Sequence, residues 1–385
     1  MAPLAHALHD SIHLRHSILV TGQHRSMLDG INSAFGISPQ FDLDLMRPDQ
    51  SLATLTSRAM DGVASLLNRE PFDAIVVHGD TSTSTAAAMA GFLSQVPIFH
   101  LEAGLRSNDL RSPFPEEGNR RVTAQLANLH LAPTELNRRN LERENIPHSQ
   151  IAVIGNTVID ALLYITSNGA QSNNPELRSL YESGRPLVVV TAHRRESHGA
   201  GLQRVALAIR RLAMERPDTT FLLPLHGNPA VRQSLVPGLE AQHNVLLTEP
   251  LDYVEFALAM KHARLVITDS GGVQEEAPSL GVPVLVIRDV TERTEAVTAG
   301  TVVMVGTDPE RIWSEATSIL DDPLKHAEMS RADNPYGDGR ASIRAVAAME
   351  EYFNLGERLT SFTPGAPARL SGALASFAGL AGLRS

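Results

Sequence analysis

The chain has 385 residues, 43% of them hydrophobic, which is longer than one hydrophobic core usually covers and predicts two domains. A net charge of −10 and a pI of 5.8 exclude nucleic acid or an anionic membrane as partner, because either would require a basic face. The absence of cysteine excludes disulfides, thiolate catalysis and cysteine-ligated metals. No stretch approaches membrane-spanning length and no signal-like segment opens the chain, so we expect a cytoplasmic protein.

Short runs rich in Val, Ile and Leu recur along the chain and alternate with helical stretches such as residues 202–217. The runs occupy residues 17–22, 74–79, 96–101, 151–156, 186–193, 219–227, 244–249, 264–270, 282–289 and 301–306. Continuous apolar strands that alternate with helices are typical of parallel sheets covered on both faces. The sequence therefore predicts an α/β protein.

A sequence pattern that occurs twice divides the chain into two halves. Residues 73–104 and 263–290 share one layout: an apolar run, an acidic residue, small residues that open a helix, the pair "VP", and a second run. We therefore expect one Rossmann-like doubly wound domain in residues 1–165 and another in residues 178–340, with the boundary in the polar stretch 166–186. Residues 341–355 are expected to form a helix that packs back on the first domain. Residues 356–385, rich in Ala, Gly, Ser and Pro, are expected to be a flexible tail.

The segment "TDSGGVQEEAPSLG" suits an anionic ligand. Ser270, Gly271 and Gly272 follow a strand and open a helix, where backbone N–H groups and the helix dipole meet negative charge. Glu276, one turn later, could accept hydrogen bonds from sugar hydroxyls. A tight strand-to-helix turn with a good cap explains this segment alone equally well.

The segment "TAHRRES" (residues 191–197) places His193 and Arg194 at another strand end, where guanidinium groups could clamp a diphosphate. A solvated charged loop is at least as good an explanation for this segment by itself. His226 and Arg293 lie at further strand ends. The remaining histidines show no metal-ligand spacing, so no metal site is expected.

Carboxylates gather at strand ends in the first half. Asp80 follows a strand and could simply cap a helix, whereas Glu102 follows the next strand and could simply pair with Arg106 or Arg111. Glu116 and its neighbour Glu117 open an expected helix over residues 116–132, where acids are favourable in any protein. All three segments belong to one edge of one domain, so the pattern predicts one wall of a proton-transfer site.

Several motifs occur together: "TGQHRSML", "HGDTSTST", "HLEAGLRS", "SPFPEEGNRR", "GNTVIDAL", "TAHRRES", "DSGGVQEEAPSLGVPVLVIRDVTER" and "NPYGDGRAS". In order and spacing they resemble the non-hydrolysing bacterial UDP-N-acetylglucosamine 2-epimerase family, from residue 1 to about residue 353. The resemblance implies a glycosyltransferase-B-like fold of two Rossmann-like domains facing a cleft, a homodimer, and interconversion of UDP-N-acetylglucosamine (UDP-GlcNAc) with UDP-N-acetylmannosamine (UDP-ManNAc) for surface polysaccharides. It implies elimination of UDP to a 2-acetamidoglucal followed by re-addition, with neither nicotinamide nor metal.

The resemblance also implies roles for individual residues. The catalytic residues are expected to be Asp80, Glu102 and Glu116, which carry the proton, together with His193, which matches a position that holds UDP or the sugar. The other substrate-binding residues are expected to be Phe256, Ser270, Gly271, Gly272, Glu276 and Arg293. A second UDP-GlcNAc, as activator, is expected near Gln23, Arg58, His193, Arg194 and His226.

The chain also departs from the family pattern. Family members begin with a strand and a loop resembling "GTRPEAIKMAPL", whereas this chain starts at the equivalent of "MAPL". We expect the absent strand to leave apolar edges on both neighbours and to remove two cationic contacts to the diphosphate. Ser26 replaces a glutamine and Thr294 replaces a proline. The alternatives are a hydrolysing epimerase that releases N-acetylmannosamine and UDP, a retained glycosyltransferase activity, or a non-catalytic UDP-sugar binder.

Overall fold

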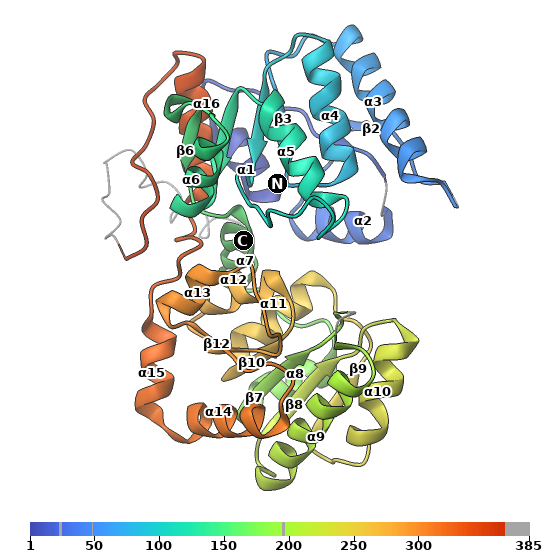
Figure 1. The fold of residues 1–385 in the computed structure, drawn as a ribbon, viewed down its shortest axis with the longest axis vertical. Coiled ribbons are helices and arrows are strands. Elements are labelled where there is room, and N and C mark those ends of the chain that lie inside the picture. The colour runs from blue at the N-terminus through green and yellow to red at the C-terminus, as the bar shows by residue number, and fades with distance from the viewer. Residues whose placement is uncertain (23–24, 48, 195–196, 366–385) are drawn as a thin grey trace, which may run out of the picture.

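The computed structural model describes residues 1–22, 25–47, 49–194 and 197–365, with side chains omitted for residues 25–27. The described residues form parallel sheets in two lobes, with the amino-terminal lobe above and the carboxy-terminal lobe below in Figure 1. Continuous apolar runs form buried strands in both lobes, and helices cover the sheets. The predicted α/β class is confirmed.

The first lobe runs from the amino terminus to the helix at the junction of the lobes. Its elements are α1 (Ala2–Asp10), β1 (Leu19–Val20), α2 (Arg25–Ala34), β2 (Phe41–Asp42), α3 (Leu52–Arg69), β3 (Ile75–His78), α4 (Ser82–Leu93), β4 (Ile98–Leu101), α5 (Glu116–Leu126), β5 (Leu129–Ala132), α6 (Glu135–Arg143), a 3-10 turn (His148–Gln150), β6 (Ile151–Val153) and α7 (Thr157–Ser167). Among the described residues its strands form two sheets, β1-β2 and β3-β4-β5-β6. Within them, β1 pairs only with β2, and β3 only with β4.

The second lobe has one six-stranded parallel sheet in the order β12-β11-β10-β7-β8-β9. Its elements are α8 (Pro175–Glu182), β7 (Leu187–Thr191), α9 (Ala200–Glu215), β8 (Thr220–Pro224), α10 (Pro229–Leu239), β9 (Val245–Thr248), α11 (Tyr253–His262), β10 (Leu265–Thr268), α12 (Gly271–Ser279), β11 (Val284–Val286), α13 (Thr294–Ala299), β12 (Val302–Met304), α14 (Pro309–Asp321) and α15 (Pro323–Arg331), and the chain then continues into α16 (Ala341–Tyr352). The central strand β10 has no solvent exposure at all, because apolar layers pack on both of its faces.

The expected helix over residues 116–132 was wrong over its last six residues, 127–132. Helix α5 ends at Leu126, and residues Leu129–Ala132 form β5, which lies between β4 and β6. A short apolar run does not by itself distinguish the end of a helix from a buried strand. Asn128 separates the two elements, because its backbone N–H donates to Ile98 O at 2.7 Å and its side-chain oxygen accepts from Ile98 N at 2.9 Å.

Helix α16 lies on the amino-terminal lobe although it follows the carboxy-terminal one (Figure 1). Its small residues, among them Ala341 and Ala345, pack in one core cluster with Leu4, Phe99 and Leu131. After this helix the chain follows β6: Arg358 Nη1 donates to Ile151 O at 2.6 Å, and Phe362 N donates to Val153 O at 2.9 Å. The first ten residues of the expected tail are therefore anchored, and residues 366–385 lie outside the described part.

None of the helices in the described ranges is long and apolar enough to cross a bilayer. The same ranges contain no group of three or more His, Asp or Glu side chains placed to hold a metal ion.

Candidate active site

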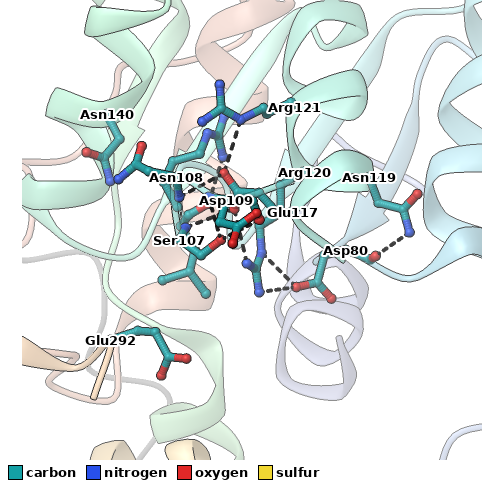
Figure 2. Close-up of polar contacts among 12 residues, drawn as sticks. Asp80, Ser107, Asn108, Asp109, Glu117, Asn119, Arg120, Arg121, Asn140 and Glu292 are labelled. Atoms are coloured by element: carbon teal, nitrogen blue, oxygen red, sulfur yellow. Dashed lines mark hydrogen bonds and ion pairs between the residues drawn. The ribbon is translucent and has the colours of Figure 1, made fainter. Parts of the chain in front are cut away.

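Asp80 lies beside Arg120 at the end of β3. Thr81, not Asp80, caps α4, because the Thr81 hydroxyl accepts from Ser84 N at 3.2 Å. Asp80 Oδ2 instead accepts from Arg120, at 2.8 Å from Nε and 2.6 Å from Nη2 (Figure 2). The backbone oxygen of Asp80 accepts from Asn119 Nδ2 at 2.8 Å. The simple capping role considered for Asp80 is therefore wrong, and its carboxylate belongs to an ion pair with α5.

Glu102 lies at the end of β4, beside the same turn. Its φ of +64° is left-handed, which is uncommon for a residue with a side chain. Burial opposes its ionisation, but a hydrogen bond and charge from His78, with Arg293 and Arg120 nearby, lower the pKa of Glu102 to about 2. The considered pairing with Arg106 does not occur, because Arg106 binds Glu144 through Nε at 2.8 Å and Nη2 at 2.7 Å.

The adjacent glutamates at the start of α5 have different environments. Glu117 is fully buried and accepts from Ser107 N at 2.9 Å, Arg121 Nε at 3.1 Å and Arg120 Nη1 at 3.3 Å (Figure 2). Glu116 Oε2 is also shielded from solvent but has no hydrogen-bond partner among the described residues. Glu117 therefore fixes the loop and the helix, whereas the carboxylate of Glu116 remains available to a ligand.

The opposite lobe presents the start of α12. Ser270 makes no side-chain cap there, so the first N–H groups of the helix have no side-chain acceptor from it. A Cβ on Gly271 would lie 3.3 Å from Arg293 Cζ, so the glycine lets the guanidinium approach the helix start. Arg293 Nε donates to Glu275 Oε1 at 2.8 Å. This wall therefore combines backbone donors with a fixed cation, which suits a phosphate.

Glu276 is buried one turn further along α12. Burial raises its pKa to about 8, and the charge of Glu275 adds to the rise. Tyr253 OH lies 3.4 Å from Glu276 Oε1. A buried carboxyl group with one long hydrogen bond has unused capacity, which a ligand hydroxyl could fill. Phe256, also expected to contact the ligand, is half-buried on α11 and packs against the core of this lobe.

His193 is held by Asp269, the residue that directly follows β10. Asp269 is fully buried, and its Oδ2 accepts from the backbone N–H groups of His193 at 2.7 Å and Arg194 at 2.8 Å. His193 Nδ1 lies 2.9 Å from Asp269 Oδ1. The carboxylate thus fixes the loop that carries the imidazole ring. The polar residues that follow the adjacent strands β7 and β10 were the feature of the sequence that could have indicated this pair.

Only some of the residues expected to bind an activator lie close to one another. The rings of His193 and His226 stack with centroids 5.7 Å apart, and Arg194 is adjacent in sequence. Arg58 lies on α3 and donates to Leu45 O at 3.0 Å, with no contact to His193 or His226 among the described residues. Gln23 lies outside the described residues, as do residues 195–196 of the "TAHRRES" segment and the side chain of Ser26.

A pocket between the lobes joins the two walls. Its lining includes Glu102 and Asn156 from the first lobe with Glu275 and Arg293 from the second. Asn156 Nδ2 donates to Glu275 Oε2 at 2.7 Å across the junction. Among the expected site residues, Glu102 and Arg293 line this pocket, whereas Asp80, Glu116, Gly271 and Glu276 do not.

Two lobes of parallel strands, with polar residues at the strand ends around a shared pocket, define a protein of the glycosyltransferase-B-like class, as expected from the motifs. Residues 6–350 match the family model described as UDP-N-acetylglucosamine 2-epimerase. The chain belongs to the UDP-N-acetylglucosamine 2-epimerase family, which confirms the family predicted from its motifs.

Individual relatives support the assignment over most of the chain. The UDP-N-acetylglucosamine 2-epimerase of Salmonella typhimurium is 46% identical over 357 residues, covering 91% of this chain and 95% of that protein. The solved structure of the Neisseria meningitidis UDP-GlcNAc 2-epimerase bound to UDP-GlcNAc is 41% identical with a TM-score of 0.82, covering 91% of this chain and 96% of that one. The Methanocaldococcus jannaschii enzyme in complex with UDP-GlcNAc and UDP is 30% identical with a TM-score of 0.72, covering 91% and 95%.

Proposed function

We propose that the chain interconverts UDP-GlcNAc and UDP-ManNAc by eliminating UDP to a 2-acetamidoglucal and adding it back. The epimerase activity follows from family membership, which makes the chain an isomerase. The elimination route is the part that the site residues support. The single observation that carries it is the junction of two unlike walls, with the carboxylates of Asp80 and Glu102 near Arg120 on one side and the start of α12 with Arg293 on the other.

The chemistry explains why both walls are needed. C2 of the sugar has no neighbouring carbonyl, so its proton is not acidic in the ground state. When the C1–O bond lengthens, its electron pair moves to the diphosphate oxygen and positive charge develops at C1, which acidifies the proton on C2. A carboxylate takes that proton as the C1–C2 double bond forms. Return of a proton to the other face and re-addition of UDP give the epimer.

Each wall supplies one half of this process. Arg293 and the backbone donors of α12 stabilise negative charge that develops on the leaving diphosphate. Asp80, Glu102 and Glu116 stabilise positive charge on the ring and carry the proton away and back. Glu276 meets a hydroxyl of the nucleoside sugar.

Incubation with UDP-GlcNAc in deuterated water tests the route. We expect deuterium at C2 of the UDP-ManNAc that forms, and of UDP-GlcNAc that has passed through the intermediate and returned. Accumulation of free N-acetylmannosamine with UDP would instead assign the hydrolysing reaction. Calorimetric binding of UDP without any exchange at C2 would assign a non-catalytic binder.

We infer that a second UDP-GlcNAc activates the enzyme through Arg194 and His226, because both lie next to His193. The rate is then expected to rise sigmoidally with substrate concentration, and His226→Ala is expected to make the curve hyperbolic. A sigmoidal curve that survives this substitution would contradict the assignment.

We also propose that the chain forms a homodimer through α4. We propose that it acts in the cytoplasm, where uridine nucleotides are made. Met89, Phe92 and Leu93 lie on one face of α4 and are 37%, 59% and 67% exposed. Exposed apolar groups at this spacing are typical of a helix-packing surface. Phe92→Asp is expected to halve the mass measured by light scattering, and a wild-type chain that is monomeric at micromolar concentration would exclude the dimer.

A further inference from the structure

We propose that His78 is a positioning residue that holds the carboxylate of Glu102 in place for proton transfer, an inference that rests on the proposed function. None of the roles above uses His78. Its Nε2 lies 3.3 Å from Glu102 Oε2. Because an ionised carboxylate only accepts hydrogen bonds, this contact requires the proton on Nε2.

Strand register brings the two side chains together. His78 is the last residue of β3 and pairs with Leu101, the last residue of β4, so Glu102 leaves the sheet beside it. Parallel strands end at the same edge of a sheet, which makes this closeness a property of the fold.

The backbone around Glu102 is held in an unfavourable state. A φ of +64° is unfavourable for a residue with a side chain, and such residues persist where their surroundings over-determine them, often at functional sites. A Cβ on Gly79 would lie 3.2 Å from Glu102 Oε2, so the carboxylate lies against the turn between His78 and Asp80. Glycine at this position therefore leaves the space that Glu102 occupies.

The turn itself is fixed from two sides. Ser84 Oγ donates to His78 O at 2.7 Å, and His100 Nε2 donates to Gly79 O at 2.9 Å. Burial lowers the pKa of His100 to about 4, so its ring is neutral and its single proton serves this bond. A fixed turn lets the side chain of His78 act as a rigid partner for Glu102.

Several other titratable groups face Glu102. Arg120 approaches from α5, Arg293 from the segment before α13, and His100 from β4 itself. Glu275 on α12 and the amino group of Met1 at the start of α1 also interact with it. Among the groups that favour its ionised form, His78 has the largest effect.

The two carboxylates therefore have different partners. Asp80 is held by the guanidinium group of Arg120. Glu102 lies against the imidazole ring of His78.

Three variants separate this role from a merely structural one. His78→Leu removes the donor, and His78→Gln keeps an N–H donor without the imidazole ring. His148→Gln is the matched control, because His148 forms a similar pair with Glu142, at 2.9 Å, on the exposed surface. UDP binding by calorimetry, whose partners lie on the other lobe, checks that each variant is folded.

We expect His78→Leu to lower kcat for deuterium exchange at C2 by about tenfold or more while KM changes less than about twofold. In the pH profile of kcat, the acid limb is expected to shift to higher pH by about one unit or more, because Glu102 loses the partner that kept its pKa low. His78→Gln should recover part of the rate, and His148→Gln should behave as wild type. Unchanged kcat and pH limb in folded His78→Leu would overturn the positioning role.

A second measurement needs no turnover. The side-chain carboxyl carbon of Glu102, labelled with 13C and assigned by its loss in Glu102→Gln, is expected to stay at its ionised position from about pH 7 to pH 4 in the wild type. In His78→Leu it should shift within that interval. An identical titration in both proteins would overturn the pairing. If the wild type bound UDP but exchanged no deuterium, the proposed function would fail, whereas this titration would still decide whether His78 holds Glu102.

Discussion

The two lobes solve the same problem, placing polar groups at the ends of parallel strands, in different ways. The carboxy-terminal lobe has one six-stranded sheet whose central strands β7 and β10 are almost completely buried. The amino-terminal lobe divides its described strands between two sheets, and β3, which leads to Asp80, is mostly half-buried. Its site residues are held by ion pairs, among them Arg120 with Asp80 and Glu117.

This difference matches the ligand groups that each lobe is proposed to bind. A phosphate needs backbone donors at a fixed helix start, and packing of α12 against an apolar sheet provides them. Proton transfer needs carboxylates with controlled ionisation, and nearby arginines and histidine provide that control. The binding wall is therefore stabilised chiefly by packing and the proton-transfer wall by electrostatics.

The largest expected effects distinguish the proton-transfer wall from the anion-binding wall. Asp80→Asn should lower turnover by about 10²–10⁴-fold while the Kd of UDP changes little, because a proton-transfer group is lost. Gly271→Val should instead weaken UDP binding by about tenfold or more, because the new side chain displaces Arg293 from the helix start. Deuterium-exchange kinetics measure turnover in both variants, and calorimetry measures their affinity for UDP. Together they check that the two walls have separate roles. Loss of UDP affinity in Asp80→Asn would contradict it.

Removing a buried charge from the proton-transfer wall should destabilise the protein strongly. Glu117→Ala leaves Arg120 and Arg121 without their buried acceptor, and we expect about 3–5 kcal/mol to be lost from the free energy of unfolding. Urea unfolding measures the change. Glu310→Ala, which removes an exposed partner of Arg211, is the control and should have little effect. Similar losses in both variants would contradict an electrostatic basis for the first wall.

The buried carboxyl group of Glu276 should make stability depend on pH. Its folded pKa, about 8, exceeds the ordinary value of 4.5, so between these values the folded chain keeps a proton that the unfolded chain releases. The free energy of unfolding therefore falls as pH rises through this window. Glu276→Gln should remove that fall and exceed the wild type at pH 8 by on the order of 2 kcal/mol. The free energy of unfolding of both proteins is measured at pH 5.5 and pH 8. An equal difference between the two proteins at both pH values would contradict the argument from burial.

The smallest effect concerns a surface pair of the carboxy-terminal lobe. Arg216 and Asp321 approach to 2.6 Å, but Asp321 is half exposed. Replacing either with alanine should cost about 1 kcal/mol or less, because solvent and salt screen the pair. Thermal unfolding at low and high salt checks this. A cost comparable to that of Glu117→Ala would remove the distinction between the two lobes.

Parts of the site could be predicted from the sequence because they are local. The strand-to-helix glycines at Gly271 and Gly272 and the carboxylates at strand ends were recognisable from their neighbours. The partners of those residues were not, because the pairs of Arg120 with Asp80 and of Asp269 with His193 join positions 40 and 76 residues apart. The strand β5 was missed because its short apolar run fitted the end of a helix.

The class of the fold, the family and the polar residues at the strand ends could be predicted from the amino-acid sequence, since these depend on local patterns and on motifs in a fixed order. Long-range contacts were needed to show which of two adjacent glutamates is buried in an ion cluster, which residue caps α4, and that Glu102 is paired with His78. Those outcomes depend on strand register and on desolvation by distant segments, neither of which is encoded at the residue itself.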